Sequence, residues 1–237
     1  MGILDHKVVL VTGASRGIGL AIAQTLGQEG AQLVMVARHD KPLRQAVAGV
    51  PGVAMSMAVD ITQPGEVKKL FAAVKKRMGR LDVLINNAGV FTFKPFAKTT
   101  LEDWRRNIDT NLTSIFLTTQ AALPLLERRG GDVVNILSIS SRVTFENCSA
   151  YSAAKFGARG LTGVLRKELR GKGIRVTAIL PGMTNTRMKD EFTFPVRGQD
   201  LVQPEDVSAA VRNALAQPRN ATVEEILVMP SGGSVGE

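Results

Sequence analysis

The chain has 237 residues, of which 44% are hydrophobic, so it can bury one sizeable core. It carries 30 Lys and Arg against 21 Asp and Glu, a formal net charge of +9. Such an excess suits nucleic acid, an acidic protein or an anionic cofactor. The basic residues are dispersed among acids, and no zinc-finger spacing or RNA-binding aromatic motif accompanies them. We therefore expect a solvated basic surface and no nucleic-acid partner.

The rare residue types limit metal and disulfide chemistry. Cys148 has no second cysteine to pair with, which is typical of a reducing compartment, and we expect it to be a bystander rather than a reactive thiol. His6 and His39 have no neighbours at ligand spacing, so no catalytic metal is expected. The sequence shows no signal-peptide pattern and no apolar run long enough for a membrane. We expect a cytoplasmic protein with no membrane partner.

The chain begins with a predicted buried strand over residues 7–11, a glycine-rich loop over 12–19 and a helix over 20–28. In this layout backbone amides and a helix N-terminus receive a pyrophosphate. The glycine spacing is Gly-x-x-x-Gly-x-Gly, and a glycine turn with no ligand is the alternative. The flanking strand and helix favour phosphate binding. The residues expected to bind the cofactor here are Gly13, Ser15, Arg16, Gly17, Ile18 and Gly19.

A second strand is predicted over residues 31–37, and its end selects the cofactor. An acid at this position binds a ribose 2′-hydroxyl, whereas a nearby arginine accommodates a 2′-phosphate. Here Ala37 is followed by Arg38, with Arg16 as a second candidate, so we expect NADP(H). Asp40 is the one competitor for the acidic role, and two solvated arginines are the other interpretation.

The remaining pattern alternates strands with helices. Further strands are predicted over residues 53–59, 81–85, 133–137, 174–180 and 226–229. Helices are predicted over residues 65–78, 101–126, 150–169 and 204–216. Asn111 lies inside the long second of these helices, where we expect an irregularity. The alternation predicts a single Rossmann-type, doubly wound parallel α/β sheet of about seven strands with helices on both faces. One domain is expected over residues 1–237, with a cofactor half over 1–135 and a catalytic and substrate half over 136–237.

Tyr151 and Lys155 are four residues apart at the start of a predicted helix, on one face of it. A phenol has a reference pKa of about 10, and a nearby ammonium is expected to lower it towards the working range. Ser138 follows the fifth strand, where its hydroxyl can meet the tyrosine. Taken alone, the Tyr and Lys pair is also what an ordinary amphipathic helix contains.

Together these motifs resemble the short-chain dehydrogenase/reductase family over essentially the whole chain. The residues that carry the resemblance are the loop 12–19, Asp60, the Asn-Asn-Ala-Gly sequence 86–89, Asn111, Ser138, Tyr151, Lys155, Pro181, Gly182 and Thr186. Within the family the chain is similar to 3-oxoacyl-carrier-protein reductases and to small ketone and alcohol reductases.

The resemblance implies a role for each matching residue. Tyr151 would give a proton to the carbonyl oxygen while the nicotinamide gives a hydride to carbon. Lys155 would bind the nicotinamide ribose and lower the tyrosine pKa. Ser138, rather than its neighbouring serines, would hold the carbonyl oxygen, and Asn111 would position a water. Further cofactor contacts would come from Asp60, Ile61, Asn87, Ala88, Gly89, Pro181, Gly182, Thr184 and Thr186. Ser141 and Thr184 depart from the family pattern, which bears on pocket shape.

Apolar side chains cluster after the fourth, fifth and sixth strands, where ligands of parallel sheets bind. They are Phe91, Phe93, Phe96, Val143, Phe145, Met183, Phe192 and Phe194. We expect an apolar pocket for bulky or aromatic ketones and 3-ketoesters, with residues 187–203 as a short lid.

Three further expectations concern alternatives and partners. A 3-oxoacyl-carrier-protein reductase would use Arg128, Arg129 and Lys172 to meet an acidic acyl-carrier protein. A non-catalytic NADP(H) sensor would not need the Ser, Tyr, Lys and Asn set. A homo-oligomer, either dimer or tetramer, is expected.

Overall fold

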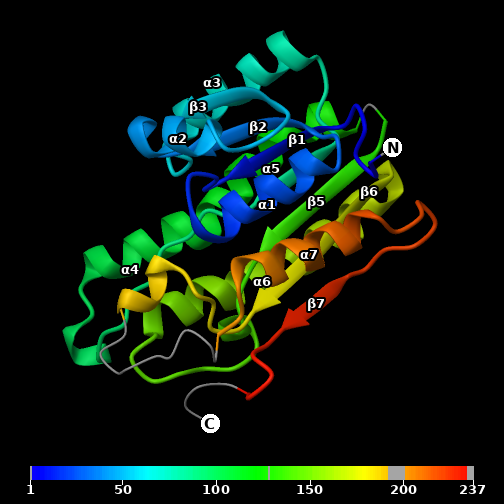
Figure 1. The fold of residues 1–237 in the computed structure, drawn as a ribbon. Helices are drawn as coiled ribbons and strands as arrows, with labels where there is room; N and C mark the ends of the chain where they lie inside the picture. The colour runs from blue at the N-terminus through cyan, green and yellow to red at the C-terminus, as the bar shows by residue number, and fades with distance from the viewer. Residues whose placement is uncertain (1, 128, 192–200, 234–237) are drawn as a thin grey trace.

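The computed structural model describes residues 2–127, 129–191 and 201–233, and it contains one seven-stranded parallel sheet (Figure 1). The strand order is β3-β2-β1-β4-β5-β6-β7. The strands are β1 (Val8–Thr12), β2 (Gln32–Ala37), β3 (Val53–Ala58), β4 (Val83–Asn86), β5 (Gly131–Ile136), β6 (Ile174–Pro181) and β7 (Glu225–Val228). The predicted fold class is therefore confirmed.

The apolar, β-branched sequences of the central strands suit a sheet that is covered on both faces. On one face lie α1 (Gly17–Gln28), α2 (Asp40–Val47) and α7 (Pro204–Leu215). On the other lie α3 (Pro64–Met78), α5 (Ser114–Leu126) and α6 (Ser149–Leu169). Figure 1 shows α1 and α7 in front of the strands. No helix among the described residues is long and apolar enough to cross a membrane.

The chain reverses its winding direction between β1 and β4, which are neighbours in the sheet. From β1 the chain winds outward through β2 to β3, and then it returns to β4 on the other side. The helices that follow β1 and β4, α1 and then α5, therefore cover opposite faces of the sheet, and a crevice opens at the carboxyl ends of these two strands. This topological switch point is where open α/β sheets bind ligands.

Two elements differ from the sequence prediction. The expected helix over 101–126 is divided into α4 (Leu101–Ile108) and α5 by a π-helical turn at Asp109–Thr113, so the irregularity expected around Asn111 is confirmed. Helix α2 was not predicted. Its eight residues include Pro42, and its apolar side chains, Leu43, Ala46 and Val47, cover about one helical turn, which is too short a pattern to predict a helix from the sequence.

Candidate active site

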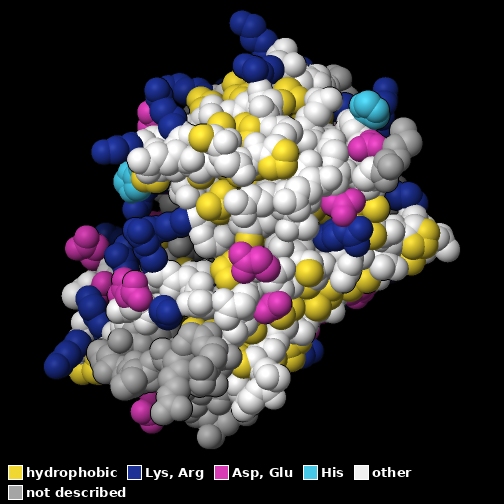
Figure 2. Space-filling view, viewed as in Figure 1, with side chains coloured by type: hydrophobic (Ala, Val, Ile, Leu, Met, Phe, Trp, Pro, Cys, Tyr) yellow, Lys and Arg dark blue, Asp and Glu magenta, His cyan; other side chains and the backbone are white. Residues whose placement is uncertain are grey.

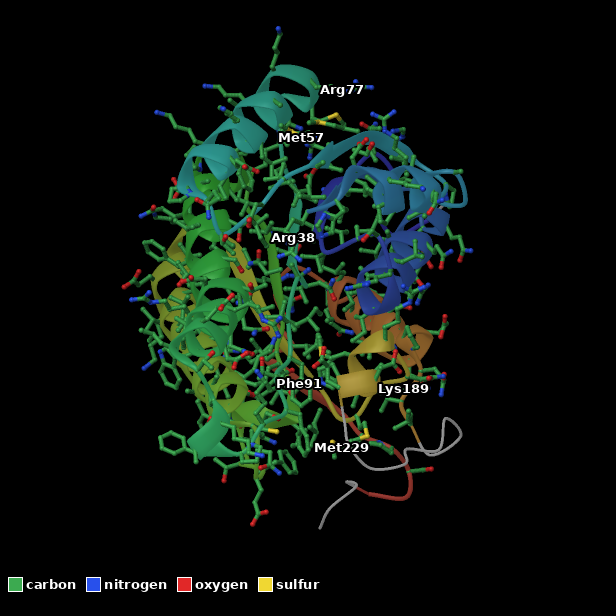
Figure 3. The ribbon with its side chains drawn as sticks, turned by 90° about the vertical axis from the view of Figure 1, so that its left-hand side faces the viewer. Arg38, Met57, Arg77, Phe91, Lys189 and Met229 are labelled. Carbon is green, nitrogen blue, oxygen red and sulfur yellow. The ribbon has the colours of Figure 1, made fainter. Side chains whose placement is uncertain are left out.

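A cavity of 1680 Å³ lies along the carboxyl ends of the central strands. Figure 3 shows Arg38 in one part of this region, well separated from Phe91 and Lys189. In Figure 2, Lys and Arg side chains gather along the left edge of the molecule, beside α2 as Figure 1 labels it. All of the residues predicted to be catalytic or to bind the cofactor line this cavity.

Glycines of the loop after β1 form a cradle that side chains would fill. A Cβ at Gly13 would lie 2.9 Å from Ala88 Cα, and the φ of Gly13 is +66°. A Cβ at Gly19 would collide with the Gly13 carbonyl oxygen and the Asn87 amide nitrogen. The loop thus passes close to the backbone after β4 and leads into the N-terminus of a twelve-residue helix. These features fit a dinucleotide pyrophosphate.

The loops on either side of the switch point are tied together by Thr12 and Asn87. The Thr12 hydroxyl oxygen accepts hydrogen bonds from the backbone amides of Asn87 at 3.0 Å and Ala88 at 3.1 Å. The Asn87 side-chain amide donates to the Thr12 carbonyl at 2.8 Å. This clamp fixes the width of the crevice, so it pre-organises the site for a rigid ligand.

The residues at the end of β2 indicate whether the bound dinucleotide carries a 2′-phosphate. Arg38 and Arg16 both lie exposed at the cavity, and Arg38 Nε donates to His39 Nε2 at 3.2 Å. The competing acid, Asp40, is paired with Arg44 at 2.7 Å on α2 and is not among the cavity-lining residues. This end of the cavity therefore presents guanidinium groups, which suit a phosphate.

Asp60 and Ile61 follow β3 and line the same end of the cavity. The Asp60 carboxylate accepts from the Thr62 hydroxyl at 2.7 Å and from the Thr62 amide at 3.0 Å. Ile61 is buried. The side chains of Asp60 and Ile61 are thus fixed before any ligand binds.

Ser138, Tyr151 and Lys155 meet where β5 ends and α6 begins, and all three are buried. The Ser138 side chain lies close enough to the tyrosine hydroxyl to lower its pKa. The Ser140 amide donates to Ser138 Oγ at 3.1 Å, and Ser141 Oγ donates to the Ser138 carbonyl at 2.6 Å. The two neighbouring serines therefore hold Ser138 in place, while Ser138 itself contacts the phenol.

The expected lowering of the Tyr151 pKa by Lys155 is wrong for the protein alone. Burial raises the pKa of Tyr151 to about 12, against a smaller lowering by Ser138. Burial also lowers the pKa of Lys155 to about 8. The lysine Nζ donates to the Ile136 carbonyl at 3.1 Å and lies 5.7 Å from the tyrosine ring centroid. Burial dominates both shifts because both groups are enclosed, and Lys155 is not among the groups that shift the tyrosine pKa.

Lys155→Met is expected to stabilise the protein while destroying the site. Folding depresses the Lys155 pKa from 10.5 to about 8, which costs about 3 kcal/mol below pH 8, where both states are protonated. Between pH 8 and 10.5 the unfolded state holds more protons, so the cost is progressively relieved. Loss of the Ile136 hydrogen bond offsets about 1 kcal/mol of the gain.

The measurement is urea unfolding of wild type and variant at pH 7 and at about pH 9.5, below the Tyr151 pKa in either state. The variant should be more stable at pH 7, and most of its advantage should be lost at the higher pH, where the cost has fallen to about 1.4 kcal/mol and the lost hydrogen bond nearly offsets it. A variant that is less stable at pH 7, or an advantage that grows with pH, would contradict the account.

Asn111 is fully buried in the π-helical turn and binds the loop after β4. Its side-chain amide donates to the carbonyls of Val90 at 2.9 Å and Asn107 at 3.1 Å, and its oxygen accepts from the Val90 amide at 3.3 Å. A π-helical turn of this kind often marks a functional position. Asn111 therefore orders the loop beside the nucleotide crevice, and its role in positioning a water stays a prediction.

The expected apolar wall is formed by part of the predicted set. Phe91, Phe93, Phe145 and Met183 line the cavity. The ring of Phe91 packs edge-on against Tyr151, with centroids 4.9 Å apart. Phe96 and Val143 were predicted wrongly, since they are 81% and 40% exposed and do not line the cavity. Phe192 and Phe194 lie outside the described residues.

The segment after β6 closes the cavity on the side of α7. Pro181, Gly182, Thr184 and Thr186 line it, and the Thr184 hydroxyl donates to the Gly182 carbonyl at 3.0 Å. Of the expected lid, residues 187–191 form a short 3₁₀ helix that also lines the cavity, and 192–200 lie outside the described residues.

Cys148 packs with Phe91 and Tyr151 in a small buried cluster. Burial raises the pKa of its thiol to about 11. A thiol with a raised pKa is a poor nucleophile at neutral pH. The expectation that Cys148 is a bystander agrees with this and stays a prediction.

Sequence reasoning missed Arg106 on α4, which lines the cavity. Its guanidinium donates to the Phe91 carbonyl and to the Thr92 hydroxyl, both at 3.1 Å. The adjacent Asn107 also donates to the Thr92 hydroxyl, at 2.8 Å. These hydrogen bonds hold the loop that carries Phe91 and Phe93, and no local sequence motif predicts them.

Comparison with known proteins agrees with this geometry. A family model described as short chain dehydrogenase matches residues 7–195. An uncharacterized oxidoreductase of Staphylococcus saprophyticus is 34% identical over 232 residues, which are 96% of this chain and 98% of that relative. An uncharacterized oxidoreductase of Staphylococcus aureus strain USA300 is 35% identical over 232 residues, 97% of this chain and all of the relative.

Solved structures show the same fold. A metagenomic short-chain oxidoreductase in complex with NADP has a TM-score of 0.83 at 30% identity, covering 97% of this chain and 99% of that one. An alcohol dehydrogenase from the archaeon Thermococcus sibiricus, complexed with 5-hydroxy-NADP, has a TM-score of 0.86 at 27% identity, covering 98% and 99%.

The fold and the site define a Rossmann-type oxidoreductase. The chain belongs to the short-chain dehydrogenase/reductase family, as its motifs predicted.

Proposed function

We propose that the protein is an NADPH-dependent carbonyl reductase, which interconverts ketones and secondary alcohols. The observation that carries the proposal is the contact between Ser138 and Tyr151, with Lys155 one helical turn away, at the carboxyl edge of β5. These residues lie in one cavity with the glycine cradle. When bound, NADPH supplies the hydride.

The chain's own residues handle the proton and the carbonyl oxygen. Ser138 and Tyr151 present two hydroxyl groups, so one carbonyl oxygen can accept a hydrogen bond from each. Tyr151 then gives its proton to the alkoxide that develops there. Because burial raises the tyrosine pKa, the phenol is fully protonated at neutral pH and ready to act as the acid in the reducing direction.

Arg38 and Arg16 would hold the 2′-phosphate of NADPH, and the cradle of Gly13, Gly17 and Gly19 would receive its pyrophosphate. Both solved relatives described above were crystallised with NADP or a derivative of it, which supports this choice. Asp60, Ile61 and residues 87–89 would line the adenine and ribose, and Thr184 and Thr186 the carboxamide end.

Ala37→Asp is expected to reverse the preference from NADPH to NADH. Ala37 is the last residue of β2 and lines the cavity, so a carboxylate there would repel a 2′-phosphate and accept a hydrogen bond from a 2′-hydroxyl. The check is kcat/KM for each cofactor at a fixed ketone concentration. A wild-type enzyme with equal kcat/KM for both cofactors would contradict the assignment.

The substrate class follows from the wall around the reacting hydroxyls. Phe91, Phe93, Phe145 and Met183 give that wall an apolar part, which suits an apolar or aromatic group on the substrate. We propose bulky apolar or aromatic ketones and 3-ketoesters as substrates. Lys172, expected to meet an acyl-carrier protein, is paired with Glu127 at 2.7 Å, and Arg128 lies outside the described residues.

The test of function is kcat/KM with NADPH for an aryl ketone, a 3-ketoester, an acyl thioester and a sugar under one set of conditions. The aryl ketone and 3-ketoester should be preferred. Preference for the sugar would overturn the apolar-wall argument. Preference for the thioester would favour the carrier-protein reductase instead.

We also propose a cytoplasmic homo-oligomer, either a dimer or a tetramer. The lone buried thiol suits a reducing compartment. Large apolar side chains stand exposed on neighbouring helices: Trp104 on α4, Phe116 on α5, and Phe156 and Val164 on α6. Such a patch favours self-association. Light scattering should give the molar mass of at least a dimer, and a monomeric mass would contradict this.

A further inference from the structure

One carboxylate joins three parts of the molecule that are far apart in the sequence. Glu225 is the first residue of β7, the edge strand beside β6 (Figure 1). Its Oε2 accepts from Arg159 Nε at 3.0 Å, and its Oε1 from Arg159 Nη2 at 3.3 Å. The same Oε1 is 2.8 Å from Arg142 Nη2. Glu225 is thus held by two cations, one on α6 and one in the loop after β5.

Arg142 connects the ion pairs of Glu225 to the loop that follows Ser138. Arg142 closes the short 3₁₀ helix at Ile139–Ser141, which begins directly after Ser138. The residues that follow Arg142, numbers 144–148, line the cavity and carry Phe145 of the apolar wall. Arg142 therefore lies midway between the serine and the apolar residues that face the substrate.

The other cation fixes the carboxylate from the helix that carries the tyrosine. Arg159 lies one helical turn after Lys155 on α6, and its side chain binds Glu225 through two of its nitrogens. A carboxylate held by a two-nitrogen fork has a defined position, which a single flexible pair does not give. The Glu225 oxygen can then restrain Arg142 relative to both α6 and the sheet.

We infer that Glu225 is a positioning residue, which holds the loop 138–148 so that its apolar wall meets the substrate. The inference rests on the proposed carbonyl reductase activity. Since the restrained part of the loop lies after Ser138, its release should affect the fit of the carbonyl substrate. Cofactor binding depends on the opposite part of the cavity and should not change.

The chain supplies a matched control. Glu224, the preceding residue, also pairs with two arginines, Arg166 at 3.4 Å and Arg170 at 3.1 Å. Neither arginine lies at the cavity. Glu224→Gln and Glu225→Gln therefore each remove two half-exposed ion pairs from the same edge of the protein. Only the second change releases the loop.

The experiment measures KM for an aryl ketone, KM for NADPH, and kcat for the wild type and both variants. Glu225→Gln should raise the ketone KM roughly 5- to 10-fold, the size expected for one or two half-exposed ion pairs. The NADPH KM should stay the same. Glu224→Gln should leave all three parameters at wild-type values. Arg142→Met should match Glu225→Gln, the double variant should be no worse than either, and Arg142→Lys should recover part of the loss.

Several outcomes would overturn the inference. An effect of Glu225→Gln equal to that of Glu224→Gln would contradict it. So would a rise of the NADPH KM in Glu225→Gln. Additive effects of Arg142→Met and Glu225→Gln would show that the two residues act separately. If the wild type reduces no ketone at all, the proposed function fails. If the wild type reduces ketones and Glu225→Gln has wild-type kinetic parameters, only the inference about Glu225 fails.

Discussion

Tyr151→Phe is expected to lower kcat for ketone reduction by 10²- to 10⁴-fold, the range for loss of a positioned acid. Phenylalanine keeps the ring, so the edge-on packing against Phe91 survives. Only the hydroxyl is lost, and with it the proton donor and the interaction with Ser138. Since the ring still fills its place, the affinity for NADPH should change little.

The measurement is single-turnover reduction of an aryl ketone together with NADPH binding by fluorescence. Ser138→Ala should also be severely impaired, because Ser138 is the serine that contacts the phenol. Ser140→Ala should be affected much less, because the backbone amide of Ser140, not its hydroxyl, donates to Ser138. Retention of more than about a tenth of kcat in Tyr151→Phe would refute the assignment of Tyr151 as the acid.

Gly19→Ala is expected to abolish useful affinity for NADPH. The added Cβ would collide with the Gly13 carbonyl oxygen and the Asn87 amide nitrogen, so α1 or the loop must shift. The Gly13 oxygen is packed backbone, and the Asn87 side-chain amide is held by its hydrogen bond to the Thr12 carbonyl, so neither neighbour yields easily. We expect the NADPH Kd to rise roughly 30- to 150-fold, which corresponds to the upper part of the 1–3 kcal/mol that overpacking costs.

Gly65→Ala is the matched control for this change. It lies in the first turn of α3, in the same half of the chain, and its Cβ would meet nothing within 4 Å. That variant should bind NADPH as the wild type does. Both variants should be tested for folding by circular dichroism. A folded Gly19→Ala protein with wild-type affinity would show that the cradle does not receive the pyrophosphate.

Much of the fold could be predicted because its signals are local. The strands are short apolar runs, and the glycine spacing around Gly13 and Gly19 marks a close approach of backbones. Asn111 was conspicuous as a polar residue within a helical pattern, and it does lie in a π-helical turn. Helix α2 escaped prediction because its apolar side chains, Leu43, Ala46 and Val47, cover only about one helical turn.

The parts of the site that could not be predicted depend on burial and on distant partners. Lys155 lies on the same helical face as Tyr151, but the enclosure that raises one pKa and lowers the other is invisible in the sequence. Phe91 and Phe96 belong to one apolar cluster of the sequence, yet one is buried against the tyrosine and the other is exposed. The pairing of Arg142 with Glu225 joins a loop to a distant edge strand, and only the folded chain brings them together.

The most direct test of the proposed reaction is to follow the label from NADPH that carries deuterium at both positions of nicotinamide C4. An aryl ketone is reduced by the wild-type enzyme, and the alcohol is analysed by mass spectrometry and NMR. The account predicts one deuterium on the carbinol carbon, one NADPH consumed per alcohol formed, and 10²- to 10⁴-fold slower product formation with Tyr151→Phe. Alcohol without deuterium on that carbon, or no alcohol from any carbonyl compound while NADPH binds, would contradict it.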